Sequence, residues 1–173
     1  MTSKENVGLE IERKYIIEMP DFDILSKQEN YRRSEIEQIY LDSPKGETHR
    51  IRRRVFSNYT EYTETRKIRI DKMSVTEIEG EISEQKYNLL KNDIKIETLP
   101  IIKIRHNFTY LGQVFEIDVY PQWKRSAVLE TELADRKTVV SFPDFIRIIR
   151  EVTGIKGYSN AAMSVSFPPE DKN

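Results

Sequence analysis

Residues 9–17, read as LEIERKYII, form the segment whose residue types and spacing are best suited to chemistry. As a β-strand, the segment would point Glu10, Glu12 and Lys14 to one face, because side chains alternate along a strand. Two carboxylates on one face repel each other and favour a cation between them. A hard divalent ion such as Mg²⁺ takes oxygen ligands and phosphate oxygens together. The segment therefore predicts a metal and phosphate site, although a solvated edge strand explains it equally well on its own.

The composition narrows the classes of protein to which the chain belongs. It has 173 residues, 28 Lys and Arg against 29 Asp and Glu, and a formal net charge of −1, a balance that argues against general nucleic-acid binding. The absence of cysteine excludes disulfides and thiolate metal sites. No apolar run approaches the roughly 20 residues of a membrane helix, and residues 1–8 lack an apolar signal region. We expect one cytoplasmic domain without nucleic-acid or membrane partners, its oligomeric state open, with a homodimer as one option.

Seven further segments alternate apolar and polar residues as strands do. They are residues 36–42, 49–56, 61–70, 74–82, 101–108, 114–120 and 127–133. Capping residues predict helices over residues 22–28, 84–90 and 160–165, after Asp21, Ser83 and Ser159 respectively. A capping box at residues 141–144 predicts a fourth helix that runs to residue 152. We expect a disordered segment at 1–8, a folded domain over 9–165 and a loose polar tail at 166–173.

Charges on these strands segregate strand by strand. The basic rows are Arg50/Arg52/Arg54, Lys67/Arg69 and Lys103/Arg105, and the acidic rows are Glu77/Glu79/Glu81, Glu116/Asp118 and Glu130/Glu132. A sheet with one solvated face explains this segregation poorly. An eight-stranded antiparallel barrel would turn the charged faces into its lumen and the apolar faces outward. Such a lumen needs a compensating ligand, and a metal-bound polyphosphate suits acids through the metal and bases directly.

The ordered series of motifs resembles the CYTH superfamily, the triphosphate tunnel metalloenzymes. The first motif, Glu10-Ile-Glu12-Arg-Lys14, matches the ExExK signature of that family, which is weak alone but strong as part of a series. The series continues through Arg50-Ile-Arg52, Thr65-Arg-Lys67, Glu77-Ile-Glu79, Lys103-Ile-Arg105, Glu116-Ile-Asp118, Glu130-Thr-Glu132 and Tyr158-Ser-Asn160. The resemblance covers about residues 9–164. The EIERK form is more similar to short bacterial inorganic triphosphatases than to the cyclases.

The resemblance implies a mostly β, α+β fold: a closed eight-stranded antiparallel barrel with a charged lumen and helices packed outside. It implies a metal-dependent triphosphatase with Mg²⁺ or Mn²⁺ as cofactor and a small-molecule triphosphate as substrate. The metal ligands would be Glu10, Glu12, Glu130 and Glu132. The substrate-binding residues would be Lys14, Arg50, Arg52, Lys67, Lys103 and Arg105. Catalysis would involve Lys14, Glu79 and Asp118, while the roles of Glu77 and Glu116 stay open.

Several functions remain open at this point. The candidate lumen faces hold almost no aromatic residue, which favours inorganic tripolyphosphate, because a nucleobase usually needs a stacking platform. The alternatives are a class IV-type adenylate cyclase, a thiamine triphosphatase and a non-catalytic polyphosphate- or nucleotide-binding module. Arg54, Arg69 and Glu81 either extend the rows or sit at the rim. We interpret His49 and His106 as structural.

Overall fold

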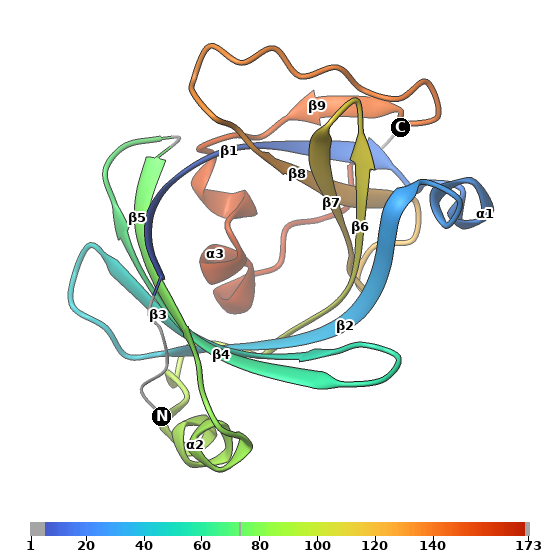
Figure 1. Cartoon of the computed structure of the whole chain (residues 1–173). Coiled ribbons are helices and arrows are strands. Elements are labelled where there is room, and N and C mark those ends of the chain that lie inside the picture. The colour runs from blue at the N-terminus through green and yellow to red at the C-terminus, as the bar shows by residue number, and fades with distance from the viewer. Residues whose placement is uncertain (1–5, 73, 172–173) are drawn as a thin grey trace.

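Eight antiparallel strands close into a ring in the computed structural model, which describes residues 6–72 and 74–171 (Figure 1). The strands are β1 (Asn6–Glu18), β2 (Glu29–Leu41), β3 (Glu47–Val55), β4 (Thr60–Arg69), β5 (Ser74–Glu81), β6 (Ile101–Tyr110), β7 (Gln113–Val119) and β8 (Ser126–Glu132). They pair in the order β5-β4-β3-β2-β6-β7-β8-β1, and a β1–β5 pairing closes the ring. The predicted closed eight-stranded antiparallel barrel is confirmed.

Strand β1 closes the barrel by changing partners along its length. Its residues 6–11 pair with β5, and its residues 12–18 pair with β8. A ninth strand, β9 (Ile148–Glu151), pairs with β1 at residues 15–17, beyond the part of β1 that β5 occupies. Strand β1 thus pairs with β8 along one edge and with β5 and then β9 along the other, while the Lys14 N–H donates to the Thr153 hydroxyl at 3.0 Å.

The apolar faces of the strands point outward, as expected. One outer cluster centres on Phe115, Ile117 and Leu129, and the connection between β8 and β9 covers it with Phe142 and Phe145. A second outer cluster, at β2 and β3, contains Ile39, Ile51 and Tyr87. Tyr87 belongs to α2 (Glu84–Leu90), which packs against that wall. The barrel therefore keeps two of its apolar cores outside and leaves most of its lumen to charged residues.

The third apolar cluster closes one end of the barrel. It contains Ile16, Tyr40, Tyr120 and Val128, which share strand faces with the charged lumen residues, and Met163 of α3 (Asn160–Val165). Helix α3 is visible through the ring in Figure 1, and Tyr120 donates a hydrogen bond to the Asn160 side chain at 2.7 Å. This position differs from the expected one on the outer wall, because inward apolar side chains at this end need a cover.

Three predicted helix caps are confirmed. Asp21 accepts hydrogen bonds from the backbone N–H groups at the start of α1 (Phe22–Leu25), Ser83 caps α2 and Ser159 caps α3. Helix α1 ends three residues earlier than expected. Two short 3₁₀ turns, η1 (Lys91–Asp93) and η2 (Lys156–Tyr158), complete the helical elements among the residues described. None of these helices is long and apolar enough to cross a membrane.

The helix predicted over residues 141–152 is wrong. Residues 141–147 form turns and loop, and residues 148–151 form β9. The segment is rich in isoleucine, which favours strands, and β1 offers it an edge whose backbone groups need partners. Of the apolar residues that predicted the helix, Phe145 and Ile146 pack on the outer core, and Ile149 and Val152 pack in the cluster that closes one end of the barrel.

Residues 6–8 and 166–171, near the two ends of the chain, are more ordered than the sequence suggested. Strand β1 begins at Asn6, inside the segment expected to be disordered, while residues 1–5 lie outside the part described. In the tail, Pro168 accepts a hydrogen bond from the Trp123 indole at 3.1 Å, and Arg150 pairs with Asp171 at 2.8 Å. Residues 166–171 therefore pack against the barrel, which differs from the loose tail that we expected.

Candidate active site

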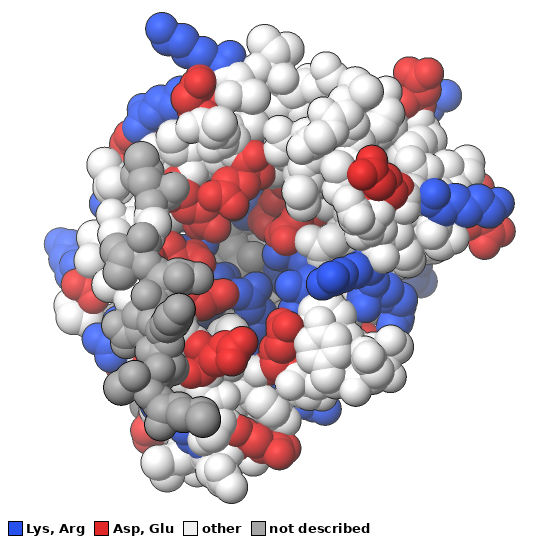
Figure 2. All heavy atoms as spheres, in the orientation of Figure 1, with Lys and Arg blue, Asp and Glu red and all other residues white. Residues whose placement is uncertain are grey.

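The lumen is divided between a mainly basic side and a mainly acidic side. Strands β3 and β6 contribute the basic side chains, which are Arg50, Arg52, Arg54, Lys103 and Arg105. Strands β1, β5 and β8 contribute the carboxylates Glu10, Glu12, Glu77, Glu79 and Glu132. Figure 2 shows this division at the open end of the barrel, with red atoms at the left and top of the hollow and blue atoms deeper and to the right. The division is partial, because Lys14 and Lys67 lie among the carboxylates of the acidic side, and Asp118 and Glu130 lie among the basic side chains.

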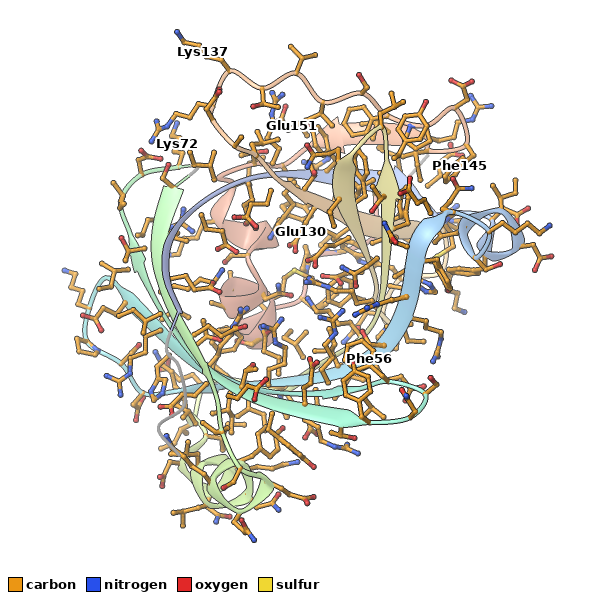
Figure 3. The ribbon with its side chains drawn as sticks, in the orientation of Figure 1. Phe56, Lys72, Glu130, Lys137, Phe145 and Glu151 are labelled. Carbon is orange, nitrogen blue, oxygen red and sulfur yellow. The ribbon has the colours of Figure 1, made fainter. Side chains whose placement is uncertain are left out.

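A fully paired network lies deep in the lumen. Arg105 donates two hydrogen bonds to Asp118, from Nε to Oδ1 at 2.6 Å and from Nη2 to Oδ2 at 2.7 Å. Lys103 Nζ donates to Asp118 Oδ2 at 2.6 Å. Glu130, seen near the centre of Figure 3, accepts from Arg105 at 3.0 Å and from Lys14 at 2.7 Å. Charge-assisted bonds of this length fix the side chains of the network.

Burial and pairing shift the pKa values in this network. Burial opposes ionisation of Asp118, but Arg105 and Lys103 outweigh it and hold the pKa of Asp118 below its usual value. Burial likewise disfavours the charged form of Lys14, yet Glu130 and Glu12 raise its pKa. For Lys103 burial prevails over Asp118, so its pKa falls to about 8. Lys103 is thus the cation of the network that loses its proton most easily.

Arginines from β3 form the middle of the basic side. Arg52 donates to Glu79 at 2.8 Å, and the Thr65 hydroxyl donates to the same carboxylate at 2.6 Å. Arg50 lies 3.7 Å from Glu79, and its Nε is buried without a hydrogen-bond partner among the described residues. Burial and the neighbouring Arg50 lower the pKa of Arg52 to about 10. The carboxylates present therefore only partly compensate this group of arginines.

The opposite wall carries too little positive charge. Glu12 and Glu132 are register partners across β1 and β8. The Glu132 carboxylate has no hydrogen bond or ion pair with any residue described, although the Glu132 backbone carbonyl accepts a hydrogen bond from Gln113 at 2.7 Å. The single ion pair of Glu12 is with Lys14 at 3.8 Å. Burial and the neighbouring Glu77 and Glu116 raise the pKa of Glu132. This mutual repulsion marks a place where an added cation would be stabilised.

The carboxylate oxygens of the acidic side are suitable ligands for a hard divalent cation, although they do not converge on one point in this structure. Within residues 6–72 and 74–171, no three acidic or histidine side chains converge as metal ligands. Glu10 is bonded to Lys67, and Glu130 is bonded to Lys14 and Arg105. Glu12 and Glu132 are the expected ligands without a close basic partner. Carboxylate oxygens are the donors that Mg²⁺ prefers.

The remaining sequence candidates separate into lumen and outside residues. Arg54 faces the lumen, bonded to Ser34 and Asn107, whereas Arg69 lies at the exposed rim against the Asp71 carbonyl. His49 pairs with Glu64 at 2.8 Å and His106 bonds to Tyr31 at 2.9 Å. Both histidines have such protein partners outside the lumen network, and burial lowers the pKa of His106 to about 4.

Sequence reasoning missed the polar residues that support the arginines. Gln38 is completely buried, accepts a hydrogen bond from Arg50 at 3.2 Å and donates to the Tyr40 hydroxyl at 2.6 Å. Asn107 links Arg54 to Glu116. The alternation of residues 36–42 already placed Gln38 and Tyr40 on one face, and that face lies in register with the arginines of β3.

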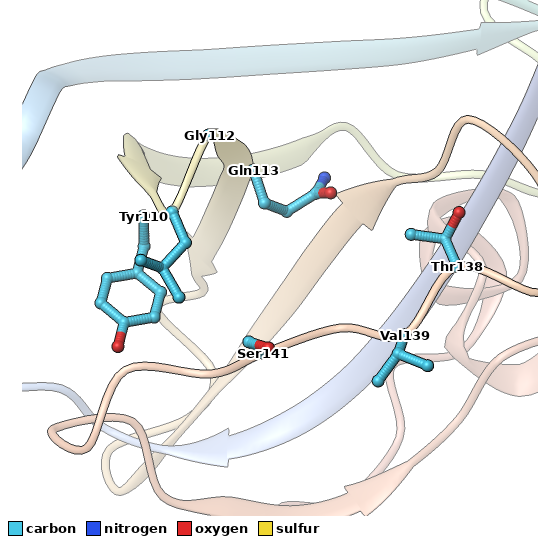
Figure 4. A pocket seen from close by; sticks show the side chains of 7 residues that line it. Tyr110, Gly112, Gln113, Thr138, Val139 and Ser141 are labelled. Carbon is cyan, nitrogen blue, oxygen red and sulfur yellow. The ribbon is translucent and has the colours of Figure 1, made fainter.

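A separate cavity of about 300 Å³ lies away from this charged site (Figure 4). It is formed by the turn between β6 and β7 and by the connection after β8, with Tyr110, Gln113 and Val139 among its lining residues. None of its lining side chains is acidic or basic. This cavity therefore does not suit a polyphosphate, whereas the barrel lumen does.

Comparison with solved structures identifies similar barrels. The inorganic triphosphatase NE1496 is 25% identical, with a TM-score of 0.58, over 93% of this chain and 97% of its own. PH1819 from Pyrococcus horikoshii OT3 is 26% identical, with a TM-score of 0.55, over 73% of this chain and 80% of its own. HpAC1 from Hippeastrum, described as a candidate adenylyl cyclase with a dominant triphosphatase activity, is 16% identical, with a TM-score of 0.52, over 72% and 80%. Neither a protein-family model nor a curated protein matches the chain.

Proposed function

Because this chain has the CYTH, or triphosphate tunnel, fold, we propose that it is a metal-dependent hydrolase of triphosphates, with inorganic tripolyphosphate as the favoured substrate. The observation that carries the proposal is the division of the lumen into a basic and an acidic side. A triphosphate on the arginines and lysines would present its free oxygens to the acidic side, where a cation can neutralise them. The 25% identity to an inorganic triphosphatase, over nearly the whole of both chains, supports the same activity.

The basic side chains bind the phosphates in this proposal. An arginine guanidinium can donate two parallel hydrogen bonds to two oxygens of one phosphate, while the lysine ammonium acts as a point charge. The binding set is Lys14, Arg50, Arg52, Lys67, Lys103 and Arg105. Each of these residues now pairs with a carboxylate, so binding exchanges part of those pairs for phosphate contacts. The unpartnered Nε of Arg50 is a donor ready for such a contact.

The acidic side holds the metal in this proposal. Glu12 and Glu132 are the primary ligands, and Glu10 and Glu130 complete the set as their lysine partners turn to phosphate. Mg²⁺ or Mn²⁺, when bound, supplies charge that stabilises the phosphate oxygens in the transition state.

Two further carboxylates act by positioning. Asp118 orients Lys103 and Arg105, and Glu79 orients Arg52. Phosphoryl transfer depends mainly on positioning and charge neutralisation, which such residues supply. A water oxygen attacks the terminal phosphorus, the bond to the bridging oxygen breaks, and tripolyphosphate yields orthophosphate and pyrophosphate. Lys14, tied to Glu130, keeps its charge beside the reacting phosphate.

We expect kcat/KM for tripolyphosphate to exceed that for ATP by at least about tenfold, a transition-state preference of about 1.4 kcal/mol. The reason is that the inward aromatic residues Tyr40 and Tyr120 are buried in the cluster at the closed end and offer a nucleobase no free face. Initial rates on tripolyphosphate, ATP and thiamine triphosphate with Mg²⁺ and with Mn²⁺ provide the measurement.

Product analysis in the same experiment separates the rival functions. Orthophosphate from every cleaved substrate fits a triphosphatase. Pyrophosphate with cyclic AMP as the main product from ATP would instead establish a cyclase, and a preference for thiamine triphosphate would redirect the substrate assignment. Binding without turnover of any of the three would leave a non-catalytic binding module.

We also expect kcat/KM to fall as the pH rises above about 8, because this quantity reports the free enzyme and Lys103 has a pKa of about 8 there. Below that pH Lys103 is protonated and attracts phosphate; above it the charge is lost. Lys103→Arg should move the alkaline limb to higher pH, since arginine stays protonated. An unchanged alkaline limb in this variant would exclude Lys103 as its source.

A further inference from the structure

Lys103 lies at the boundary between the charged lumen and the apolar cluster that closes one end of the barrel. The antiparallel register between β6 and β7 pairs Ile104 with Val119. One step further, Lys103 lies opposite Tyr120, the residue that follows β7. The Lys103 ammonium is over the Tyr120 ring, 5.7 Å from its centroid, within the range at which the negative face of a ring attracts a cation. The two residues are 2% and 1% exposed, so water screens this contact little.

The Lys103 ammonium has few other partners for a buried cation. It carries three N–H donors, and its single hydrogen bond to a described residue is the one to Asp118 at 2.6 Å. Glu130 on β8 attracts it, whereas Arg105 on its own strand repels it. Tyr40 of β2, whose pKa is raised by burial, belongs to the same apolar cluster as the ring. Burial outweighs the two carboxylates, so each remaining contact with the ammonium affects whether Lys103 keeps its proton.

Three contacts fix the Tyr120 ring in place. Its hydroxyl donates to the Asn160 side chain at 2.7 Å, at the start of α3, the helix that is visible through the ring of strands in Figure 1. Trp123 and Phe167 pack edge-on against it, with ring centroids 5.9 Å and 5.3 Å away. Because the ring cannot turn without breaking these contacts, it presents one fixed face to the Lys103 ammonium.

We propose that Tyr120 is a positioning residue for Lys103, and that its fixed ring face holds the charged ammonium at the inner end of the lumen. This inference rests on the proposed function for its consequence, because Lys103 is assigned there to phosphate binding. Tyr120 itself touches no phosphate, since its hydroxyl is bonded to Asn160 and its ring is packed among protein side chains. Without the ring face the charged form of Lys103 is less stable, and the ammonium loses its proton at a lower pH.

The primary test measures the pKa of Lys103 in protein free of metal and ligand. NMR titration of protein with labelled lysine side chains gives this pKa, and Lys103→Arg assigns the signal. We expect Tyr120→Leu, which removes the ring, to lower the pKa from about 8 by about half a pH unit or more. Tyr120→Phe keeps the ring and loses the hydroxyl, so it should leave the pKa unchanged. A fluorinated phenylalanine at the same position keeps the shape and weakens the negative face, and it should lower the pKa even if Tyr120→Leu does not fold.

A kinetic measurement and a matched control complete the test. The alkaline limb of kcat/KM for tripolyphosphate should move to lower pH in Tyr120→Leu. The same substitution made in Lys103→Arg should move no limb, because arginine stays protonated. Phe115→Leu removes a fully buried ring from the outer cluster, on the opposite face of β7, and should leave the Lys103 pKa unchanged.

Three results would overturn the proposal. An unchanged Lys103 pKa in the folded variants that lack the negative ring face would show that the ring does not hold the ammonium. An equal fall in Tyr120→Phe would assign the effect to the bond with Asn160, and an equal fall in Phe115→Leu would assign it to a general loosening of the barrel. Failure of the proposed function is separately visible: wild-type protein that does not hydrolyse tripolyphosphate with Mg²⁺ or Mn²⁺ refutes the hydrolase and leaves the titration result intact.

Discussion

Glu132→Gln is expected to lower kcat/KM for tripolyphosphate by about 10² or more at limiting Mg²⁺, because charge stabilisation by a bound metal is worth several kcal/mol. The substitution preserves the shape of the side chain and removes its charge. The Glu132 carboxylate has no ion pair within the described residues, and burial together with the neighbouring Glu77 and Glu116 raises its pKa. Initial rates over a range of Mg²⁺ concentrations measure the loss, and raising Mg²⁺ should restore part of it.

Glu151→Gln is the matched control for this variant. Glu151 lies on β9 outside the barrel, labelled in Figure 3, and pairs with Arg13 at 3.0 Å on the surface. It undergoes the same chemical change without facing the lumen, so its kinetics should stay within twofold of the wild type. If Glu132→Gln retains near-native turnover at limiting Mg²⁺, the metal assignment is wrong.

Asp118→Ala should reduce the free energy of unfolding by about 3–5 kcal/mol, the usual cost of removing one partner from a buried ion pair. Asp118 is completely buried and accepts hydrogen bonds from both Lys103 and Arg105. Its removal leaves Lys103 facing Arg105 with less compensating charge in a region shielded from water. Urea unfolding followed by circular dichroism measures the change.

Glu35→Gln provides the corresponding surface control. Glu35 pairs with Arg33 at 3.1 Å, and its side chain is 62% exposed, so the change should cost no more than about 1 kcal/mol. Similar losses in both variants would show that the buried network contributes little beyond an ordinary surface pair.

The strands and the lumen faces were predictable from the sequence because charge and apolarity alternate so regularly. Arg50 and Arg52 alternate with Ile51, and Glu116 and Asp118 alternate with Ile117, so one face of each strand is unambiguous. Register then brings the rows together, as Lys14 faces Glu130 across β1 and β8. Local cap chemistry likewise fixed the starts of the helices at Asp21, Ser83 and Ser159.

Features that depend on tertiary neighbours were not predictable. Residues 148–151 form a strand because they pair with residues 15–17 of β1. The local sequence of residues 148–151 does not contain this information. Helix α3 covers an end of the barrel because Ile16 and Tyr120 are inward and apolar there. The bonds that fix Arg54 come from Ser34 and Asn107 on two other strands. The assigned roles of the lumen residues stay predictions, since geometry gives partners rather than rates.

The most direct test of the central claim is to follow tripolyphosphate by phosphorus NMR in the presence of purified protein and Mg²⁺. The lumen described above predicts that tripolyphosphate disappears as orthophosphate and pyrophosphate appear in equal amounts, and that a chelator stops the reaction. An unchanged tripolyphosphate spectrum at saturating Mg²⁺ and Mn²⁺, from protein that calorimetry shows to bind it, would contradict the account and leave a binding protein instead of a hydrolase.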